Sequence, residues 1–218
     1  MTDFITPVEQ ESTPSIVAEK LRQAIAHGEL VPGTQLGEAE LARSFGVSRG
    51  PLREGMQRLT QEGLLIAIRN RGVFVNTMDS REIRDMYLAR EAIERTASRQ
   101  ILQGDYASAG DALLAVVDEM AAARDLDEVS EADMRFHELL VELAGSPRLS
   151  RLHQTFLVET RMCVHALADT YDTATDRVNE HQALAGAIQS GDVALTDKLM
   201  LAHMEDAVDR LIARLPAG

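Results

Sequence analysis

Several residue types are scarce in this sequence, and each scarcity excludes a class of protein. Tryptophan is absent and aromatic residues make up only 4%, so the core must be built from Leu, Ile, Val, Ala and Met, which favours helices. The single cysteine, Cys163, excludes an internal disulfide. No apolar run approaches the roughly 18 residues of a transmembrane helix, and the first residues lack the pattern of a signal peptide. We expect a cytoplasmic, helix-rich protein without a membrane partner.

Acidic residues dominate the composition, but they are unevenly distributed. The formal net charge is −13. Residues 1–78 hold 8 Lys or Arg and 9 Asp or Glu, whereas residues 79–218 hold 14 and 26. Between positions 43 and 71 there are six arginines and only two acids. A local basic patch is what binding to a phosphate backbone requires, so the first half of the chain is the candidate for contact with nucleic acid.

The first 77 residues predict a polar, disordered arm over 1–14 and a winged helix-turn-helix over 15–77. Apolar spacing and the breakers Gly28, Gly46 and Gly63 divide this region into three helices. The short β-type runs LLIAI and GVFVN are separated by RNR and predict a hairpin. The predicted segments are helices from 15 to 28, 38 to 45 and 49 to 62, with the helix-turn-helix at about 38–62 and the wing at 64–76.

Basic side chains fall on the two elements that a winged helix directs at DNA. The second helix of the motif presents its first turns to base edges, and here they carry Ser48, Arg49, Gly50 and Arg53. Arginine is the commonest reader of guanine, and Gly50 leaves room for close approach. The hairpin tip carries Arg69 and Arg71, which we expect to contact phosphate or the minor groove. The alternative is a solvated basic helix on an interaction domain.

The second half, 78–218, predicts an all-α antiparallel bundle. Asp79 and Glu82 form a variant of the capping box at its first helix, and short connections join the following ones. The predicted helices are 80–103, 107–125, 130–144, 147–169, 175–190 and 192–214. The overall fold class is therefore mostly α, with a winged helix-turn-helix followed by a helical bundle.

Within this bundle, Asp133 and His137 lie one helical turn apart and share a face. Taken alone, the pair suits an ordinary helix start, with Ser130 as the cap, Asp133 at the third position and His137 half-buried. However, His181 and His203 are 22 residues apart around a turn, so an antiparallel helix pair brings them level. Three imidazoles and one carboxylate suit a divalent metal, zinc first, with Ni, Mn or Fe possible. In an octahedral site two positions would remain for a bidentate carboxylate.

Residues 15–76 closely resemble the DNA-binding domain of GntR-type bacterial transcription regulators. The motifs G-E-L-x-P-G, L-x-E-x-E-L-A, G-V-S-R-x-P-L-R-E, E-G-L and R-x-R-G-x-F-V stand in order. The resemblance implies operator contacts at Ser48, Arg49 and Arg53, with Arg71 and Gly72 in the wing. Ala39 stands where some relatives have an additional arginine, and Gly50 where relatives often have Thr, so no operator sequence carries over.

Residues about 80–210 resemble the FCD effector domain of the FadR subfamily. The similarity rests on REAIE, DMRFH, AGSPRL, EHQALAGAIQSGD and the final HM pair. The metal-binding members of that subfamily carry an Asp and three His in the order found here, whereas its acyl-CoA-binding branch lacks them. Six predicted helices rather than seven would place the domain with the shorter members. The resemblance implies that the chain senses a small organic acid such as lactate, gluconate or a citrate-like compound.

A metal-bound acid also needs a counter-charge, for which Arg90 is the main candidate and Arg161 a weaker one. We therefore expect a regulator, repressor rather than activator, that binds a palindromic operator on double-stranded DNA as a homodimer. The alternatives are a metalloenzyme and a structural metal site. Against an enzyme, no additional acid or base such as the Glu of H-E-x-x-H accompanies the four ligands. The residues expected to have packing or surface roles are His27, His153, His165 and Cys163.

Overall fold

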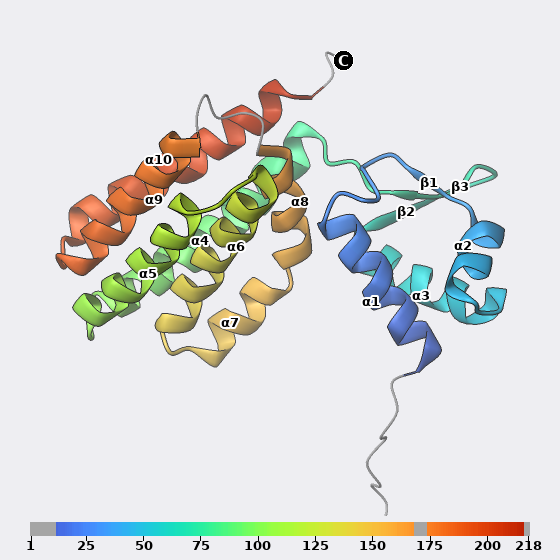
Figure 1. The fold of residues 1–218 in the computed structure, drawn as a ribbon, viewed down its shortest axis with the longest axis horizontal. Coiled ribbons are helices and arrows are strands. Elements are labelled where there is room, and N and C mark those ends of the chain that lie inside the picture. Colours follow the sequence, from blue (N-terminus) through green and yellow to red (C-terminus); the bar gives the residue numbers. More distant parts are fainter. Residues whose placement is uncertain (1–11, 168–173, 216–218) are drawn as a thin grey trace, which may run out of the picture. The chain divides into compact units, whose positions relative to one another are not determined.

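The computed structural model describes residues 12–167 and 174–215, apart from the side chains of 165–167 and 174 (Figure 1). The chain forms two compact units, Met1–Thr77 and Met78–Gly218. It is mostly helical, as predicted, with one small sheet. None of the described helices combines the length and apolar character needed to cross a bilayer.

The first unit is a winged helix-turn-helix. Its helices are α1 (Thr13–Ala26), α2 (Glu38–Phe45) and α3 (Arg49–Gln61), and its strands are β1 (Gln35–Leu36), β2 (Leu65–Ile68) and β3 (Gly72–Val75). Helix α1 begins at Thr13 with Ser12 as its cap, so the last two residues of the predicted arm are helical; residues 1–11 lie outside the described residues. Strand β1 was not predicted, because two residues carry no periodicity. It pairs with β3, which also pairs with β2.

Close packing of α1 against α3 fixes the position of the predicted recognition helix. Leu21 of α1 and Leu52, Met56 and Leu59 of α3 are buried. At Gly55 a Cβ atom would lie 2.9 Å from Val17 Cγ1, so only glycine permits this approach. The apolar face of α3 is therefore turned inward and its arginine-bearing start is left at the surface.

The second unit contains seven helices in the described residues. They are α4 (Ser80–Ile101), α5 (Tyr106–Ala121), α6 (Leu126–Leu143), α7 (Pro147–Gln154), α8 (Leu157–Leu167), α9 (Ala174–Gln189) and α10 (Val193–Ala213). The capping box at Asp79 and Glu82 is present, as predicted. The prediction of one helix over 147–169 was wrong, because α7 ends in a turn at Thr155, whose hydroxyl donates to the Leu152 carbonyl at 2.6 Å. The count of six, and the assignment to the shorter members that rested on it, are corrected accordingly.

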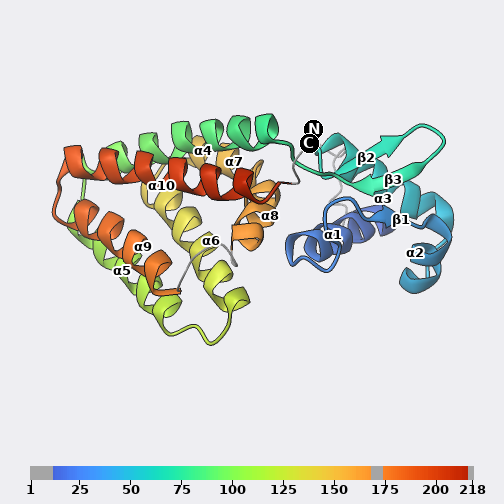
Figure 2. The same ribbon diagram turned by 90° about the horizontal axis from the view of Figure 1, so that it is seen from above.

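A continuous apolar core holds the long helices of this unit together. Its fully buried members include Leu113, Phe136, Leu184 and Ile188. Helix α4 lies beside α10, and α5 beside α9 (Figure 2). A buried group of charged and histidine side chains interrupts this core, supplied by α4, α6, α7 and α9, and the partly buried His203 of α10 adjoins it.

Candidate metal centre

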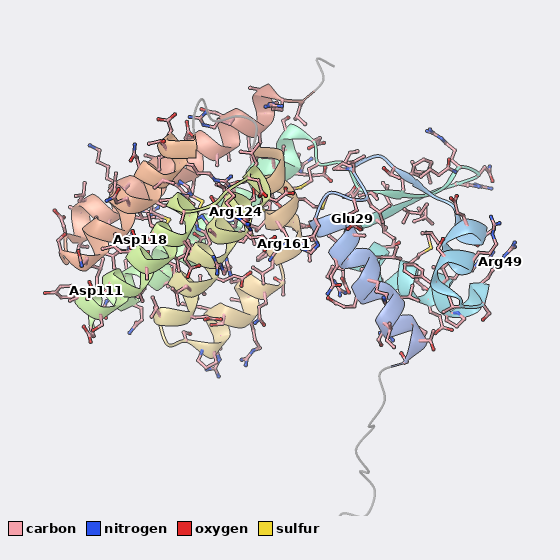
Figure 3. All side chains as sticks on the ribbon, viewed as in Figure 1. Glu29, Arg49, Asp111, Asp118, Arg124 and Arg161 are labelled. Carbon is pink, nitrogen blue, oxygen red and sulfur yellow. The ribbon has the colours of Figure 1, made fainter. Side chains whose placement is uncertain are left out.

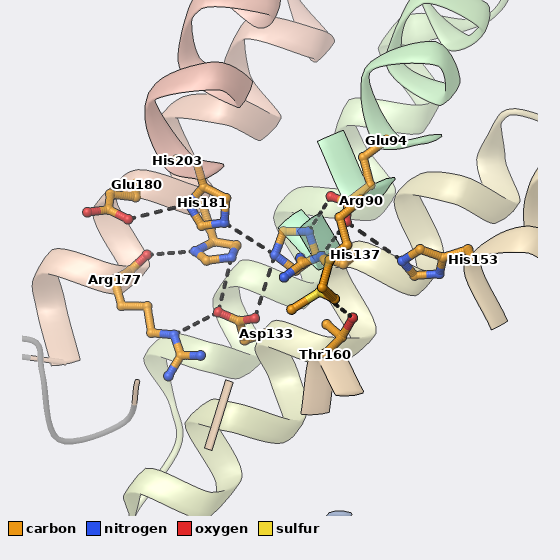
Figure 4. Close-up of polar contacts among 11 residues, drawn as sticks. Arg90, Glu94, Asp133, His137, His153, Thr160, Arg177, Glu180, His181 and His203 are labelled. Carbon is orange, nitrogen blue, oxygen red and sulfur yellow. Dashed lines mark hydrogen bonds and ion pairs between the residues drawn. The ribbon is translucent and has the colours of Figure 1, made fainter. Parts of the chain in front are cut away.

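The structure brings Asp133, His137, His181 and His203 together inside the second unit (Figure 4). Helix α6 carries the first two, α9 carries His181 and α10 carries His203. The donor atoms of the three histidines all lie within 4.8 Å of one another. Asp133 Oδ2 is 3.3 Å from His181 Nε2, and Asp133 Oδ1 is 3.6 Å from His137 Nε2. The four predicted ligands thus converge from three helices.

The capping role considered for Asp133 is wrong. Helix α6 begins at Leu126, and its cap is Asp125, whose carboxylate accepts from the Glu128 N–H at 2.9 Å. Asp133 is therefore about two turns from the start of α6, too far to cap it, and its side chain is buried. His137 is buried as well, rather than half-buried. The acid-rich run before Asp133 supplies the extra turn that the apolar pattern did not reveal.

Each of the three imidazoles has an oxygen beside its Nδ1 atom. His137 Nδ1 is 2.7 Å from Glu94 Oε2, His181 Nδ1 is 2.8 Å from the Arg177 carbonyl, and His203 Nδ1 is 3.4 Å from Glu180 Oε2. Because the Glu94 carboxylate and the Arg177 carbonyl accept, neutral His137 and His181 carry their proton on Nδ1 and keep their lone pair on Nε2, and the Glu180 carboxylate favours the same arrangement in His203. This is how outer partners fix the tautomer of metal-bound histidines.

The resulting Nε2 lone pairs have the separation that a metal requires. His137 Nε2 and His203 Nε2 are 3.3 Å apart, and two nitrogens bound to one tetrahedral zinc ion lie about 3.3 Å apart. His181 Nε2 is buried and has no hydrogen-bond partner among the described residues. Burial lowers the pKa of His137, and it lowers that of His181 to about 3. Neutral lone pairs facing one another repel, so these side chains fit a cation.

Glu94 connects the histidines to Arg90. It is completely buried, and it accepts from Arg90 Nε at 3.0 Å as well as from His137 Nδ1. Its Oε1 atom lies 3.7 Å from His153 Nε2. Burial alone would raise the pKa of Glu94, but His137 and Arg90 lower it well below its usual range. Glu94 therefore stays ionised and orients His137 from the side opposite the converging lone pairs.

Arg90, the predicted counter-charge for an acid, lies in this cluster and is buried. Its guanidinium carbon is 4.9 Å from the centre of the Tyr87 ring, and Nη2 is buried without a hydrogen-bond partner among the described residues. Burial would lower the pKa of Arg90, but Glu94 raises it overall. A buried guanidinium with an unused donor is suited to an anion.

Arg177 is a buried residue of the site that the sequence reasoning missed. It donates from Nε to Asp133 Oδ2 at 2.7 Å. Burial would raise the pKa of Asp133, but Arg177, with help from the nearby histidines, lowers it far below its usual range. A fully buried arginine is rare. The available signal was its position four residues before His181, which places both on one face of α9.

The other singled-out residues lie away from the converging atoms. Arg161, labelled in Figure 3, pairs with Glu131, and with Glu138 at 3.9 Å, both on α6; the structure does not bring it to the cluster. Cys163 is buried, which raises its pKa to about 12. His27 is exposed at the end of α1, and His153 is buried beside Glu94. The side chain of His165 lies outside the described residues.

The predicted DNA contacts are gathered on the exposed start of α3 and on the hairpin tip. Ser48 holds the N-cap position of α3 without a capping hydrogen bond from its side chain, and Arg49 and Gly50 follow as exposed residues in the first turn; Arg49 is labelled in Figure 3. The Arg53 side chain is 63% exposed, and its Nε donates to Glu38 Oε2 at 2.7 Å. The sequence reasoning missed this partner on α2.

The wing has a defined shape at its tip. Arg69, Arg71 and Gly72 are exposed, and the hairpin closes between Ile68 and Gly72. Gly72 adopts a φ of +107°, which side chains other than glycine rarely allow. Gln35 Nε2 donates to the Arg71 carbonyl at 2.6 Å, and the Arg71 guanidinium carbon is 5.5 Å from the centre of the Phe74 ring.

Comparison with known proteins is decisive for the class of this chain. Residues 14–75 match the bacterial regulatory proteins of the gntR family, and residues 85–206 match the FCD domain. The chain belongs to the GntR family. An HTH-type transcriptional regulator from the unstable DNA locus of Streptomyces ambofaciens is 32% identical over 204 residues, covering 90% of this chain and 85% of the relative.

Two further relatives agree with this assignment. The HTH-type transcriptional repressor RspR of Escherichia coli is 26% identical over 189 residues, covering 85% of this GntR chain and 83% of the repressor. A solved GntR transcriptional regulator from Rhodococcus sp. RHA1 superposes with a TM-score of 0.80 at 28% identity, covering 94% of this chain and all of that one. These matches confirm the predicted family and its class: the relatives are DNA-binding transcription regulators rather than enzymes.

Proposed function

We propose that this GntR regulator represses transcription and that a small carboxylate, bound at a divalent metal in the FCD domain, controls its DNA binding. The metal ligands are Asp133, His137, His181 and His203, with zinc the first candidate because borderline metals prefer imidazole. The convergence of three imidazoles carries the proposal, with hydrogen-bond partners at Nδ1 of His137 and His181 and a carboxylate near Nδ1 of His203.

The charges around the ligands support an acidic effector. Arg90 and Arg177 balance Glu94 and Asp133, and burial lowers the pKa values of His137 and His181, which favours their neutral forms. A divalent cation would therefore leave this buried site with an excess of positive charge. An anion offsets that excess, and the unused Nη2 donor of Arg90 provides a hydrogen bond for it.

Regulation then requires that the effector site and the DNA-binding unit share a mobile element. Helix α4 begins at Ser80, close after the end of the wing at Val75, and it carries both Arg90 and Glu94. An acid that changes the position of α4 would alter the spacing between the two recognition helices of a homodimer, and thereby its fit to a palindromic operator. The name of the E. coli relative supports repression, and a regulator of chromosomal DNA would act in the cytoplasm.

A thermal-shift screen of small carboxylates on zinc-loaded protein tests the effector class, with Asp133→Ala as the comparison. A bound acid raises the midpoint of unfolding by mass action, and the rise should vanish in the variant. If no acid stabilises the wild-type protein in any metal form, the proposed effector is wrong. If an acid binds at saturation while operator affinity stays the same, the proposed regulatory step is wrong.

The competing possibility is a purely structural metal. The variant His181→Ala separates the two possibilities. If it loses both the metal and the fold, and the wild-type protein responds to no acid, the metal has a structural role. Loss of the acid response with the fold retained would support sensing.

A further inference from the structure

Three contacts hold Arg71 at the tip of the wing. Its backbone N–H donates to the Ile68 carbonyl at 3.0 Å, and its own carbonyl accepts from Gln35 Nε2 at 2.6 Å. Its guanidinium carbon lies 5.5 Å from the centre of the Phe74 ring, which is close enough for a cation–π contact. Both backbone polar groups and the side chain of Arg71 are therefore held from within the same small sheet.

Gln35 reaches the wing tip from a distant part of the chain. It belongs to the short strand β1, where it pairs with Phe74 of β3 (Figure 1). Directly opposed residues of antiparallel strands lie on the same face of a sheet, so the Gln35 amide and the Phe74 ring share the face on which they contact Arg71. Glycine at position 72 leaves room for this arrangement, because a Cβ atom there would lie 3.1 Å from Gln35 Nε2.

Arg69, two residues before Arg71, has the same charge and is also exposed. Within the described part of the chain, however, the side chain of Arg69 forms no hydrogen bond, ion pair or ring contact. The guanidinium N–H groups of Arg71 also form no hydrogen bond to the described residues, so they remain available to DNA. An arginine that is already in position loses less conformational freedom on binding than one without such contacts.

We propose that Gln35 is a positioning residue for operator recognition, which holds the wing so that Arg71 meets the DNA in a fixed direction. The proposal rests on the predicted contact between the wing and DNA. An arginine oriented in advance suits the narrow minor groove of A·T-rich sequence, whose negative potential attracts it. Arg69 adds positive charge beside phosphate, which raises affinity for any sequence. Sequence preference under the wing therefore depends on Gln35 and Arg71 together.

Operator binding by the full chain tests this role with Gln35→Met, which keeps the length of the side chain but cannot donate a hydrogen bond. Gln61→Met is the matched control, because Gln61 is exposed at the end of α3 and its side chain forms no hydrogen bond within the described residues. On an operator selected from random sequence, Gln35→Met should weaken binding about fivefold, the usual effect of losing one hydrogen bond. Gln61→Met should bind like wild type, and neither variant should change affinity for unrelated DNA, since no charge is altered.

Two arginine variants distinguish positioning from a general weakening of the wing. When combined with Arg71→Ala, the Gln35→Met substitution should change operator affinity by less than about twofold, because residues that act through one another are not additive. When combined with Arg69→Ala, it should keep its full effect. Arg69 and Arg71 carry the same charge, so this difference does not arise from charge.

The outcomes separate the role of Gln35 from the wing contact on which it rests. An Arg71→Ala protein that binds the operator as tightly as wild type overturns the wing contact and the role of Gln35 with it. If Arg71→Ala weakens binding and Gln35→Met does not, the contact stands and the positioning role is wrong. Equal effects of Gln35→Met beside Arg69→Ala and Arg71→Ala also contradict it. Gln35→Thr, whose side chain is too short to reach the Arg71 carbonyl, replaces Gln35→Met if circular dichroism shows that this variant does not fold.

Discussion

Glu94 on α4 holds His137 on α6 through a 2.7 Å contact between Oε2 and Nδ1, with both residues almost wholly buried. The same carboxylate accepts from Arg90 at 3.0 Å. The Glu94 side chain thus orients His137, a candidate metal ligand, and also holds Arg90, the candidate partner of an acidic effector. This relationship gives the first prediction.

Glu94→Gln should weaken zinc binding by about 10–100-fold, because outer partners of metal-bound histidines contribute that much to affinity. The amide can keep the shape of the side chain but provides less negative charge to His137. Zinc titration against a competing chelator measures the change. Glu131→Gln is the control, since Glu131 is on the same unit but pairs with Arg161 at the surface. Equal losses in both variants would show only a general charge effect.

Arg177→Gln should destabilise the metal-free protein by about 3–5 kcal/mol, because it leaves the buried Asp133 carboxylate without its partner. Adding Asp133→Asn to this variant removes the uncompensated charge and should recover most of the loss. Urea unfolding of the two single variants and the double variant measures the coupling. Additive losses would contradict a direct dependence of Asp133 on Arg177.

Acid should destabilise the metal-free protein before its carboxylates are protonated. The pKa of His181 is about 3 in the folded chain against 6.5 for the ordinary group, so between these values the unfolded chain binds a proton that the folded chain does not. Stability is therefore present above about pH 6.5 and is lost as the pH falls toward 3. At pH 5 this single histidine lowers the free energy of unfolding by about 2 kcal/mol.

Urea unfolding at pH 7 and pH 5, with a chelator present, measures this loss. His181→Gln should show a smaller difference between the two pH values than wild type, by the contribution of one proton. The carboxylates of Glu94 and Asp133 contribute little to the difference between pH 7 and pH 5. Their pKa values are lowered in the folded chain, so the stability that they provide is lost only at lower pH. A variant with the full wild-type difference would refute the assignment to His181.

The sequence revealed the parts of this molecule that follow from periodicity, turn residues and spacing. The i to i+4 spacing of Asp133 and His137, and the equal distances of His181 and His203 from their turn, sufficed to assemble four residues on three helices. Arg177 was missed because its pairing with Asp133 depends on how α9 packs on α6, which local pattern does not encode. The division of α7 from α8 was missed for a similar reason, since the turn at Thr155 contains neither glycine nor proline.

The contact between Arg53 and Glu38 leads to the last prediction, which concerns DNA rather than metal. Glu38 holds the Nε of a 63% exposed arginine on the recognition helix, so it restricts the positions from which Arg53 can reach a base. Glu38→Gln should free this side chain and remove a negative charge near the phosphates. Affinity for unrelated DNA should then rise, while the preference for an operator selected from random sequence should fall by several-fold.

Glu40→Gln is the matched control for this change, because Glu40 is exposed on the same helix and its side chain forms no hydrogen bond or ion pair within the described residues. Both variants lose one acid, so both should gain some affinity for unrelated DNA through net charge. Only Glu38→Gln should lose discrimination, since Glu38 contacts Arg53, the proposed base contact, and Glu40 does not. Titrations of operator and unrelated DNA at two salt concentrations separate these effects. An equal loss of discrimination in the two variants would mean that Glu38 acts through its charge alone.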